Sequence, residues 1–169
     1  GNEFEKGSTN YQDRLYINDG DGNFKRDTAA LPQITASGQL VTPNDFDQDG
    51  DIDLFVGGRQ TPAAYPKTPQ SYWLVNEKGT FTDKIEEIAP ELQFGGMITD
   101  VEFVDLNEDG KKDMVVVGEW MKVSTYISSG LKFEENTDII DGSGLYGWWN
   151  CIEALDIDGD GIDELLLGN

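Results

Sequence analysis

The sequence predicts an all-β fold, a slice of about three four-stranded antiparallel blades from a β-propeller. Three segments, 41–58, 101–118 and 152–169, align without a gap, and the pattern of each predicts a strand, an acidic loop and a second strand. Before or between these segments lie hairpin signals with tight, glycine-containing turns, so that four strands recur roughly every 50 to 60 residues. Four-stranded antiparallel units at such a period are typical of propeller blades.

The remaining elements follow in chain order. The strands after the acidic loops are short and apolar: Leu54–Val56, Met114–Val117 and Leu165–Leu167. The hairpins pair Asp13–Asn18 with Phe24–Asp27, Ser71–Asn76 with Thr80–Ile85 around Lys78-Gly79, and Lys122–Ser128 with Leu131–Glu134 around Gly130. A weak helical pattern covers Asp83–Leu92, where Pro90 limits its length.

One propeller segment over 1–169 is therefore expected. It divides into a strand pair at 11–28, blades at 39–86 and 98–136, and a partial blade at 148–169. The strands amount to three blades, fewer than the usual four to eight, so the sequence predicts a fragment whose outer faces pack on further blades or self-associate.

The chain is strongly acidic. Its 33 Asp and Glu against 12 Lys and Arg give a formal net charge of −21, which argues against nucleic acid as a partner. Disorder is disfavoured because 37% of the residues are hydrophobic. No stretch approaches the roughly 18 apolar residues of a membrane span and no secretory signal is visible near Gly1, so no membrane insertion is expected.

The composition also limits catalysis. With no histidine, the chain has no Ser-His-Asp or Cys-His nucleophile and lacks most zinc-site chemistry. Cys151 stands beside Ile152 in an apolar strand, where we expect a buried small hydrophobe and not a nucleophile. No catalytic residue is predicted.

The three acidic loops share the pattern D-x-[DN]-x-D-G-x-x-[DE]. Positions 1, 3, 5, 7 and 9 are Asp45, Asp47, Asp49, Asp51 and Asp53 in the first loop, Asp105, Asn107, Asp109, Lys111 and Asp113 in the second, and Asp156, Asp158, Asp160, Ile162 and Glu164 in the third. Alternate oxygens on a tight turn suit Ca²⁺, which takes about six to eight oxygen ligands. Position 7 is variable, which fits a backbone carbonyl ligand. The sequence predicts about three Ca²⁺ ions.

Other interpretations of these loops were weighed. An EF-hand needs a Glu at position 12, which is Val56, Val116 or Leu167 here, and helical flanks. Polar turns without metal also favour Asp, Asn and Gly, but three copies in register favour calcium. Mg²⁺ is less suited to an all-protein cage. A similar run, Asp19, Asp21, Asn23 and Asp27, has Phe24 instead of glycine at position 6 and is interpreted as a hairpin turn.

The segments DFDQDGDIDLFVGG, DLNEDGKKDMVVVGEW and DIDGDGIDELLLGN resemble the FG-GAP/VCBS repeats of integrin-α-like propellers, and GWWNCIEALDIDGDG resembles bacterial VCBS-repeat proteins of the CRTAC1/UnbV group. The resemblance implies a seven- or eight-bladed propeller, extracellular or in the cell envelope (periplasm or cell surface), with structural Ca²⁺ and a role in adhesion or ligand binding. Glu164, Asn107 and Pro43 depart from the repeat pattern.

Three function classes stay open at this point. For a module that binds a protein or glycan, the candidate contact residues are Trp120, Tyr146, Trp148 and Trp149, whose alternative role is packing between blades. A polysaccharide-active enzyme would need a carboxylate pair. Glu102 and Glu153 recur at equivalent repeat positions and are interpreted as structural, and Glu119 and Glu134 as surface acids. A purely structural scaffold is the third class.

Overall fold

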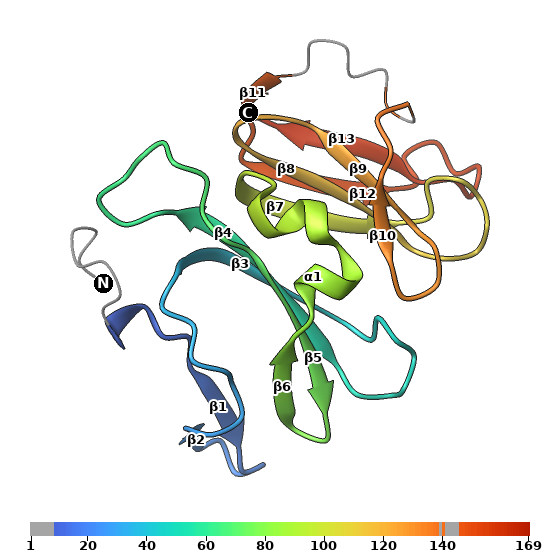
Figure 1. Ribbon diagram of the computed structural model, residues 1–169. Helices are drawn as coiled ribbons and strands as arrows, with labels where there is room; N and C mark the ends of the chain where they lie inside the picture. Colours follow the sequence, from blue (N-terminus) through green and yellow to red (C-terminus); the bar gives the residue numbers. More distant parts are fainter. Residues whose placement is uncertain (1–8, 139, 141–145) are drawn as a thin grey trace.

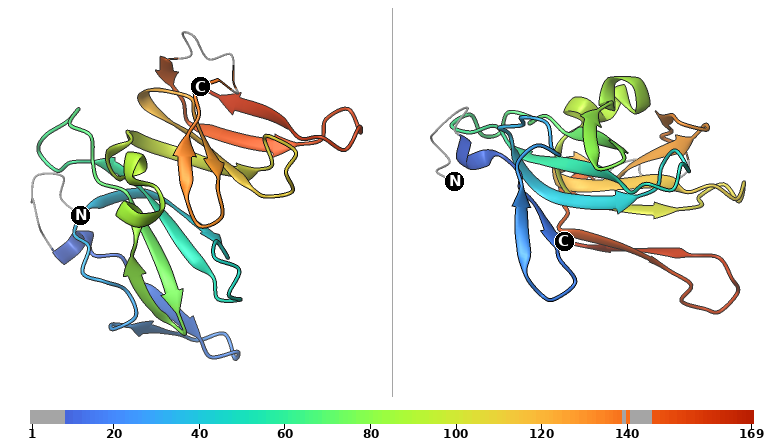
Figure 2. Two further views of the ribbon diagram at one scale, coloured as in Figure 1. Left: turned by 45° about the vertical axis from the view of Figure 1, so that its right-hand side comes forward. Right: turned by 90° about the horizontal axis from the view of Figure 1, so that it is seen from below.

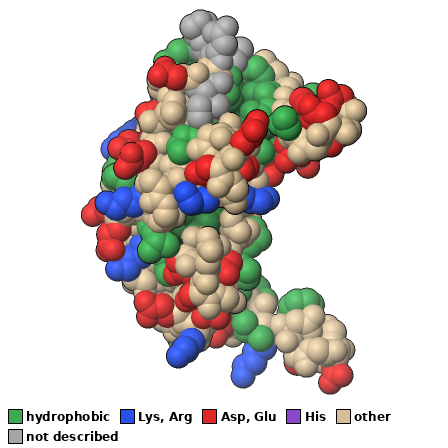
Figure 3. Space-filling model, turned by 90° about the vertical axis from the view of Figure 1, so that its right-hand side faces the viewer, with side chains coloured by type: hydrophobic (Ala, Val, Ile, Leu, Met, Phe, Trp, Pro, Cys, Tyr) green, Lys and Arg blue, Asp and Glu red, His purple; other side chains and the backbone are tan. Residues whose placement is uncertain are grey.

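The computed structural model describes residues 9–138, 140 and 146–169 and confirms the predicted fold class. Antiparallel β-sheets follow one another along a curved row, as consecutive blades of a β-propeller do (Figure 1). Seen from below, the first and last hairpins project from the same side of the central sheets (Figure 2). The space-filling view has a crescent outline, and clusters of acidic side chains are scattered over the visible face (Figure 3).

Thirteen strands form four sheets within the described residues. After the 3-10 turn η1 (Thr9–Tyr11), the first sheet pairs β1 (Leu15–Asn18) with β2 (Phe24–Asp27). The second has the order β3 (Ser37–Asn44), β4 (Asp53–Gln60), β5 (Tyr72–Glu77), β6 (Thr80–Asp83). The third contains β7 (Met97–Val104), β8 (Asp113–Lys122), β9 (Ser124–Ser128), β10 (Phe133–Glu135) and β11 (Tyr146–Trp148), and the fourth pairs β12 (Cys151–Leu155) with β13 (Glu164–Gly168).

The hairpins form where the turn residues predict them. Lys78 and Gly79 both have positive φ, 54° and 90°, as a two-residue turn between β5 and β6 requires. The weak helical pattern is realised as two short pieces, α1 (Ile85–Ile88) and the 3-10 helix η2 (Pro90–Phe94). They separate at Ala89, because Pro90 cannot donate the hydrogen bond that would continue α1.

The third sheet differs from the predicted four strands in two ways. Strand β8 continues to Lys122, well beyond the predicted end at Val117. Its additional length pairs with β11, a fifth strand that the sequence pattern does not reveal. The cause is tertiary: β11 has only three residues and pairs with a strand more than twenty residues earlier in the chain.

The hydrophobic core lies between the sheets, and strand β8 shows this best. Met114 and Val116 face the cluster shared with the second sheet, whereas Val115 and Val117 face the cluster shared with the last hairpin. All four side chains are fully buried. Burial of both faces explains the continuous apolar run of this strand, in place of apolar/polar alternation.

Cys151 is exposed, so the prediction that it is a buried hydrophobe is wrong. Side chains alternate across a strand, and in β12 it is Ile152 that enters the core. Cys151 therefore lies on the other face of the hairpin, together with exposed Leu155 and, on β13, Leu166.

Candidate metal centres in the acidic loops

Each acidic loop closes a β-hairpin in the same register. The residue before the loop pairs with the residue at position 9, as Asn44 with Asp53, Val104 with Asp113, and Leu155 with Glu164. Eight residues thus lie between each pair of facing strand ends, and the position-9 carboxylate begins the outgoing strand.

Backbone N–H groups hold the loop carboxylates in a pattern that repeats three times. The position-9 carboxylate accepts a hydrogen bond from the N–H of position 2: Phe46 to Asp53 Oδ2 (3.2 Å), Leu106 to Asp113 Oδ2 (3.0 Å) and Ile157 to Glu164 Oε2 (2.8 Å). The position-1 aspartate accepts from the glycine at position 6: Gly50 to Asp45 Oδ2 (3.2 Å), Gly110 to Asp105 Oδ2 (2.8 Å) and Gly161 to Asp156 Oδ2 (2.9 Å). The longer arm of Glu164 therefore makes the same bond as an aspartate.

The loop turns twice through the left-handed backbone region. The glycines at position 6 have φ between 83° and 96°, as the motif predicts. Position 4 is also left-handed, with φ of 61° at Gln48, 59° at Glu108 and 84° at Gly159. Sequence reasoning missed this second turn, whose signal is the glycine at position 4 in the third copy.

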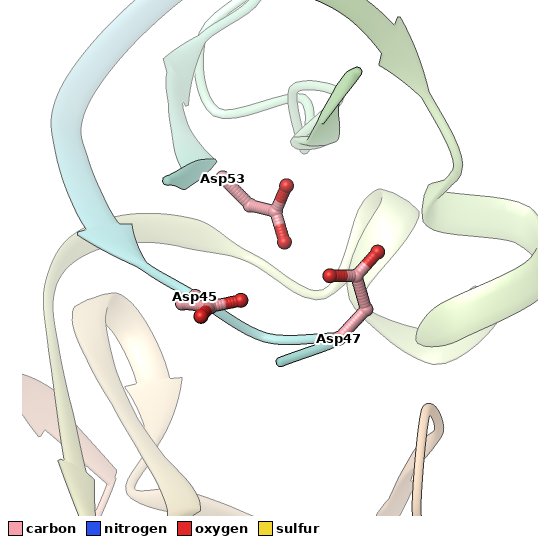
Figure 4. Close-up of side chains that lie close together, drawn as sticks. All are labelled: Asp45, Asp47 and Asp53. Atoms are coloured by element: carbon pink, nitrogen blue, oxygen red, sulfur yellow. The ribbon is translucent and has the colours of Figure 1, made fainter. Parts of the chain in front are cut away.

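The first loop brings three carboxylates together. Oxygens of Asp45, Asp47 and Asp53 lie within 4.8 Å of one another and face a common space between the end of β3 and the start of β4 (Figure 4). Asp53 has no exposed surface. The second oxygen of Asp45, Oδ1, is buried and has no hydrogen-bond partner. Unpaired buried anionic oxygens are costly, so this arrangement fits a bound cation.

The two other acids of this loop lie outside this group of three and accept other hydrogen bonds. Asp49 Oδ1 accepts the N–H of Asp51 at 2.8 Å, and Asp51 Oδ2 accepts the N–H of Lys78 at 2.8 Å in the neighbouring turn. A side chain at position 7 that faces away from the cluster agrees with a ligand role for its backbone carbonyl.

Burial raises the pKa of Asp53 above its ordinary value of 3.8, and the charges of Asp47 and Asp49 raise it further. Hydrogen bonds from Asn76 and Phe46 oppose this shift. The net direction shows that burial, together with the neighbouring negative charges, outweighs these hydrogen bonds. A divalent cation among these oxygens would reverse the balance.

The third loop has an equivalent cluster, Asp156, Asp158 and Glu164, with oxygens within 4.8 Å of one another.

The second loop differs in charge from the first and the third. Its position 3 is the amide Asn107, and the Lys111 ammonium lies 3.2 Å from Asp109 Oδ2. Hydrogen bonds from the backbone and side chain of Lys111 lower the pKa of Asp109. This loop therefore offers a cation less negative charge than the other two.

In the first two loops the position-9 carboxylate also holds the next strand. Asp53 Oδ1 accepts the N–H of Asn76 in β5, and Asp113 Oδ1 accepts the N–H of Ser128 in β9, both at 2.8 Å. Both aspartates are fully buried. Each loop is thereby fixed to three strands of its sheet.

Two aspartates of the similar acidic run in the first hairpin accept hydrogen bonds from nearby residues. Asp19 accepts hydrogen bonds from the backbone N–H of Asp21 and Asn23 and from the Asn23 side chain, and these bonds lower its pKa. Asp27 accepts from Ala29 and Ala30. These contacts agree with the interpretation of this run as a turn.

The candidate contact aromatics separate into two kinds. Trp149 is partly buried and packs on the core beside Ile152. Trp120, Tyr146 and Trp148 are exposed, in agreement with a contact role.

Of the glutamates, Glu102 on β7 and Glu153 on β12 lie on neighbouring strands of adjacent sheets. Burial raises the pKa of Glu102, and the charge of Glu153 raises it further.

This pair gives a prediction for pH dependence. The pKa of Glu102 in the folded protein lies above its ordinary value of 4.5, so ionisation opposes folding and the penalty develops as the pH rises above 4.5. Glu102→Gln should therefore raise the free energy of unfolding at pH 7 by about 0.5 kcal/mol, because solvent screens this partly exposed group. At pH 4 the gain should disappear.

Urea denaturation in EDTA at both pH values measures this difference. Glu134→Gln, at an exposed position of β10, is the matched control. A gain at Glu102 that is equal at pH 4 and pH 7 would contradict the assignment.

Fold and loops together define a β-repeat protein that carries an acidic loop at three of its hairpins. Residues 7–56, 45–116 and 105–167 match the FG-GAP-like repeat family, which covers nearly the whole chain. The chain belongs to this family. The comparison with curated proteins gives no match. Among the described residues, no helix is long and apolar enough to cross a membrane.

Proposed function

We propose that the chain is a calcium-binding module of an extracellular or cell-envelope β-propeller, that it binds a protein or glycan ligand, and that Ca²⁺ has a structural role. The observation that carries this proposal is the buried, unpartnered Oδ1 of Asp45 within a group of three carboxylates. Membership of the FG-GAP-like family supports a ligand-binding propeller. The resemblance to VCBS-repeat proteins of the cell envelope agrees with it.

The donor set favours calcium. The proposed ligands are all oxygens: the side chains at positions 1, 3 and 9, which the first and third loops already bring together, and the position-5 side chain and position-7 backbone carbonyl, which would join them around the ion. Mg²⁺ prefers to keep several waters, whereas Ca²⁺ accepts a site built mainly from protein oxygens. Calcium would neutralise the loop carboxylates, and through Asp53 and Asp113 it would stabilise the contacts with β5 and β9.

A structural role predicts that calcium raises thermal stability. At a free concentration a hundredfold above Kd, each site should add about 2.7 kcal/mol. For a chain of this length, one such site raises Tm by about 5 to 10 °C. Differential scanning calorimetry in EDTA, in calcium and in magnesium measures the effect. A Tm that is equal in EDTA and in calcium would contradict the proposal.

The proposed location agrees with the same chemistry. Extracellular calcium is in the millimolar range, which suits modules with Kd values of about 10⁻⁴ to 10⁻³ M. At cytosolic calcium concentrations such sites would be empty, and the repulsion within the clusters would be uncompensated.

A further inference from the structure

A cavity of about 350 Å³ lies at the opposite end of the sheets from the acidic loops. Strand β8 begins at Asp113 in the second loop and reaches this cavity at Glu119 and Trp120. At about 3.3 Å per residue, the two ends of the strand are more than 20 Å apart. The lining of the cavity includes Tyr65, Glu119, Trp120 and Met121.

Trp120 is presented to solvent by a β-bulge. The pairing of β8 with β11 passes from Met121 with Gly147 to Glu119 with Trp148, so Trp120 is the unpaired residue. Its φ of 57° is left-handed, which is unusual for a bulky side chain. Bulges often redirect a side chain beside a functional site, and strained backbone persists where the surrounding structure enforces it. Here the result is a tryptophan that is 63% exposed.

Aromatic side chains from three elements meet beside this cavity. Trp120 Nε1 donates a hydrogen bond to the hydroxyl of Tyr65, from the β4–β5 loop, at 2.6 Å. The ring of Trp120 meets that of Trp148, from β11, at 5.1 Å and 62°. Tyr65 and Trp148 are exposed as well. The Trp120 side chain is therefore fixed by polar and aromatic contacts while much of its surface remains open.

The geometry points to a binding site for a neutral glycan in this cavity. Aromatic rings offer flat apolar surfaces on which the C–H faces of a sugar ring pack, and half-buried Glu119 offers an acceptor for sugar hydroxyls. The net charge of −21 and this carboxylate disfavour polyanionic glycans. The inference rests on the proposed function as a ligand-binding module, and it names the ligand class and the site.

The test is titration of the calcium-loaded chain with cellohexaose, mannohexaose and maltohexaose, followed by calorimetry and tryptophan fluorescence. At least one should bind saturably, and an anionic oligogalacturonide should bind more weakly. Trp120→Ala should weaken binding about tenfold or more, as loss of a central aromatic contact does. Trp148→Ala, at an exposed position, should also weaken binding, and it replaces Trp120→Ala as the test variant if Trp120→Ala does not fold.

Phe24→Ala is the matched control, because Phe24 is also 63% exposed but lies on the first hairpin. Its binding should equal that of the parent chain. The inference is overturned if none of the three neutral sugars binds, as a surface used for a protein ligand would behave, or if the Trp120 and Trp148 variants bind as well as the control. A chain that calcium stabilises but that binds none of these sugars overturns this inference alone and leaves the structural calcium role intact.

Discussion

Asp45→Asn is expected to act in opposite directions with and without calcium. In EDTA the variant should be more stable than the parent chain by about 1 kcal/mol, because an amide N–H replaces a buried oxygen that has no partner and donates to the neighbouring carboxylates. In excess calcium it should be less stable by about 2 kcal/mol, because the contribution of one site, about 2.7 kcal/mol at a hundredfold excess over Kd, is largely lost.

Urea denaturation of both proteins in EDTA and in millimolar calcium measures whether the difference in unfolding free energy between variant and parent changes sign. Asp19→Asn is the matched control. Asp19 opens a similar acidic run, and its own carboxylate oxygens already accept hydrogen bonds from Asp21 and Asn23. Its response to calcium should equal that of the parent chain. Destabilisation by Asp45→Asn of equal size in both buffers would mean that Asp45 serves only as a turn residue.

The local geometry of the loops is predictable from sequence because it depends on neighbouring residues. Glycine at position 6 permits the left-handed turn, and the carboxylate at position 9 meets the N–H of position 2 in all three copies, even where Glu164 replaces aspartate. These contacts span at most seven residues. Whether the loops hold calcium stays a prediction that the geometry supports.

Features that depend on distant partners could not be predicted. The pairing of β11 with β8, and with it the bulge at Trp120, joins segments separated by a long loop. The position of Cys151 depends on Ile152: because Ile152 packs into the core against β8, Cys151 lies on the opposite, exposed face of β12. The weaker charge of the second loop could have been read from Asn107 and Lys111, but the contact of Lys111 with Asp109 required the structure.

A further feature missed in the sequence is the hydrophobic anchor at position 2 of the first two loops. Phe46 packs into the core between the second and third sheets, and Leu106 packs into the core between the third sheet and the last hairpin. Ile157, the equivalent residue of the third loop, is exposed. In the first two loops, the hydrophobic residue after the first aspartate thus couples the acidic loop to packing between the blades.

Trp73→Ala is expected to destabilise the chain by about 3 to 5 kcal/mol, the usual range for a large aromatic residue lost from a core. Trp73 is fully buried, and its ring lies 4.4 Å from that of Phe46 and 4.9 Å from that of Phe133. Because Phe46 follows Asp45 and its N–H binds Asp53, the cavity should also loosen the first loop. Calcium should therefore stabilise the variant less than it stabilises the parent chain.

Trp73→Phe separates packing from the polar contribution of the indole. The Nε1 of Trp73 is buried and has no hydrogen-bond partner, so phenylalanine removes an unsatisfied donor while it keeps most of the aromatic contact. Its destabilisation should be no more than about 1.5 kcal/mol, because the desolvated N–H offsets part of the lost volume. Urea denaturation with and without calcium measures both variants. Equal calcium responses of Trp73→Ala and the parent chain would show that the first loop does not depend on this aromatic cluster.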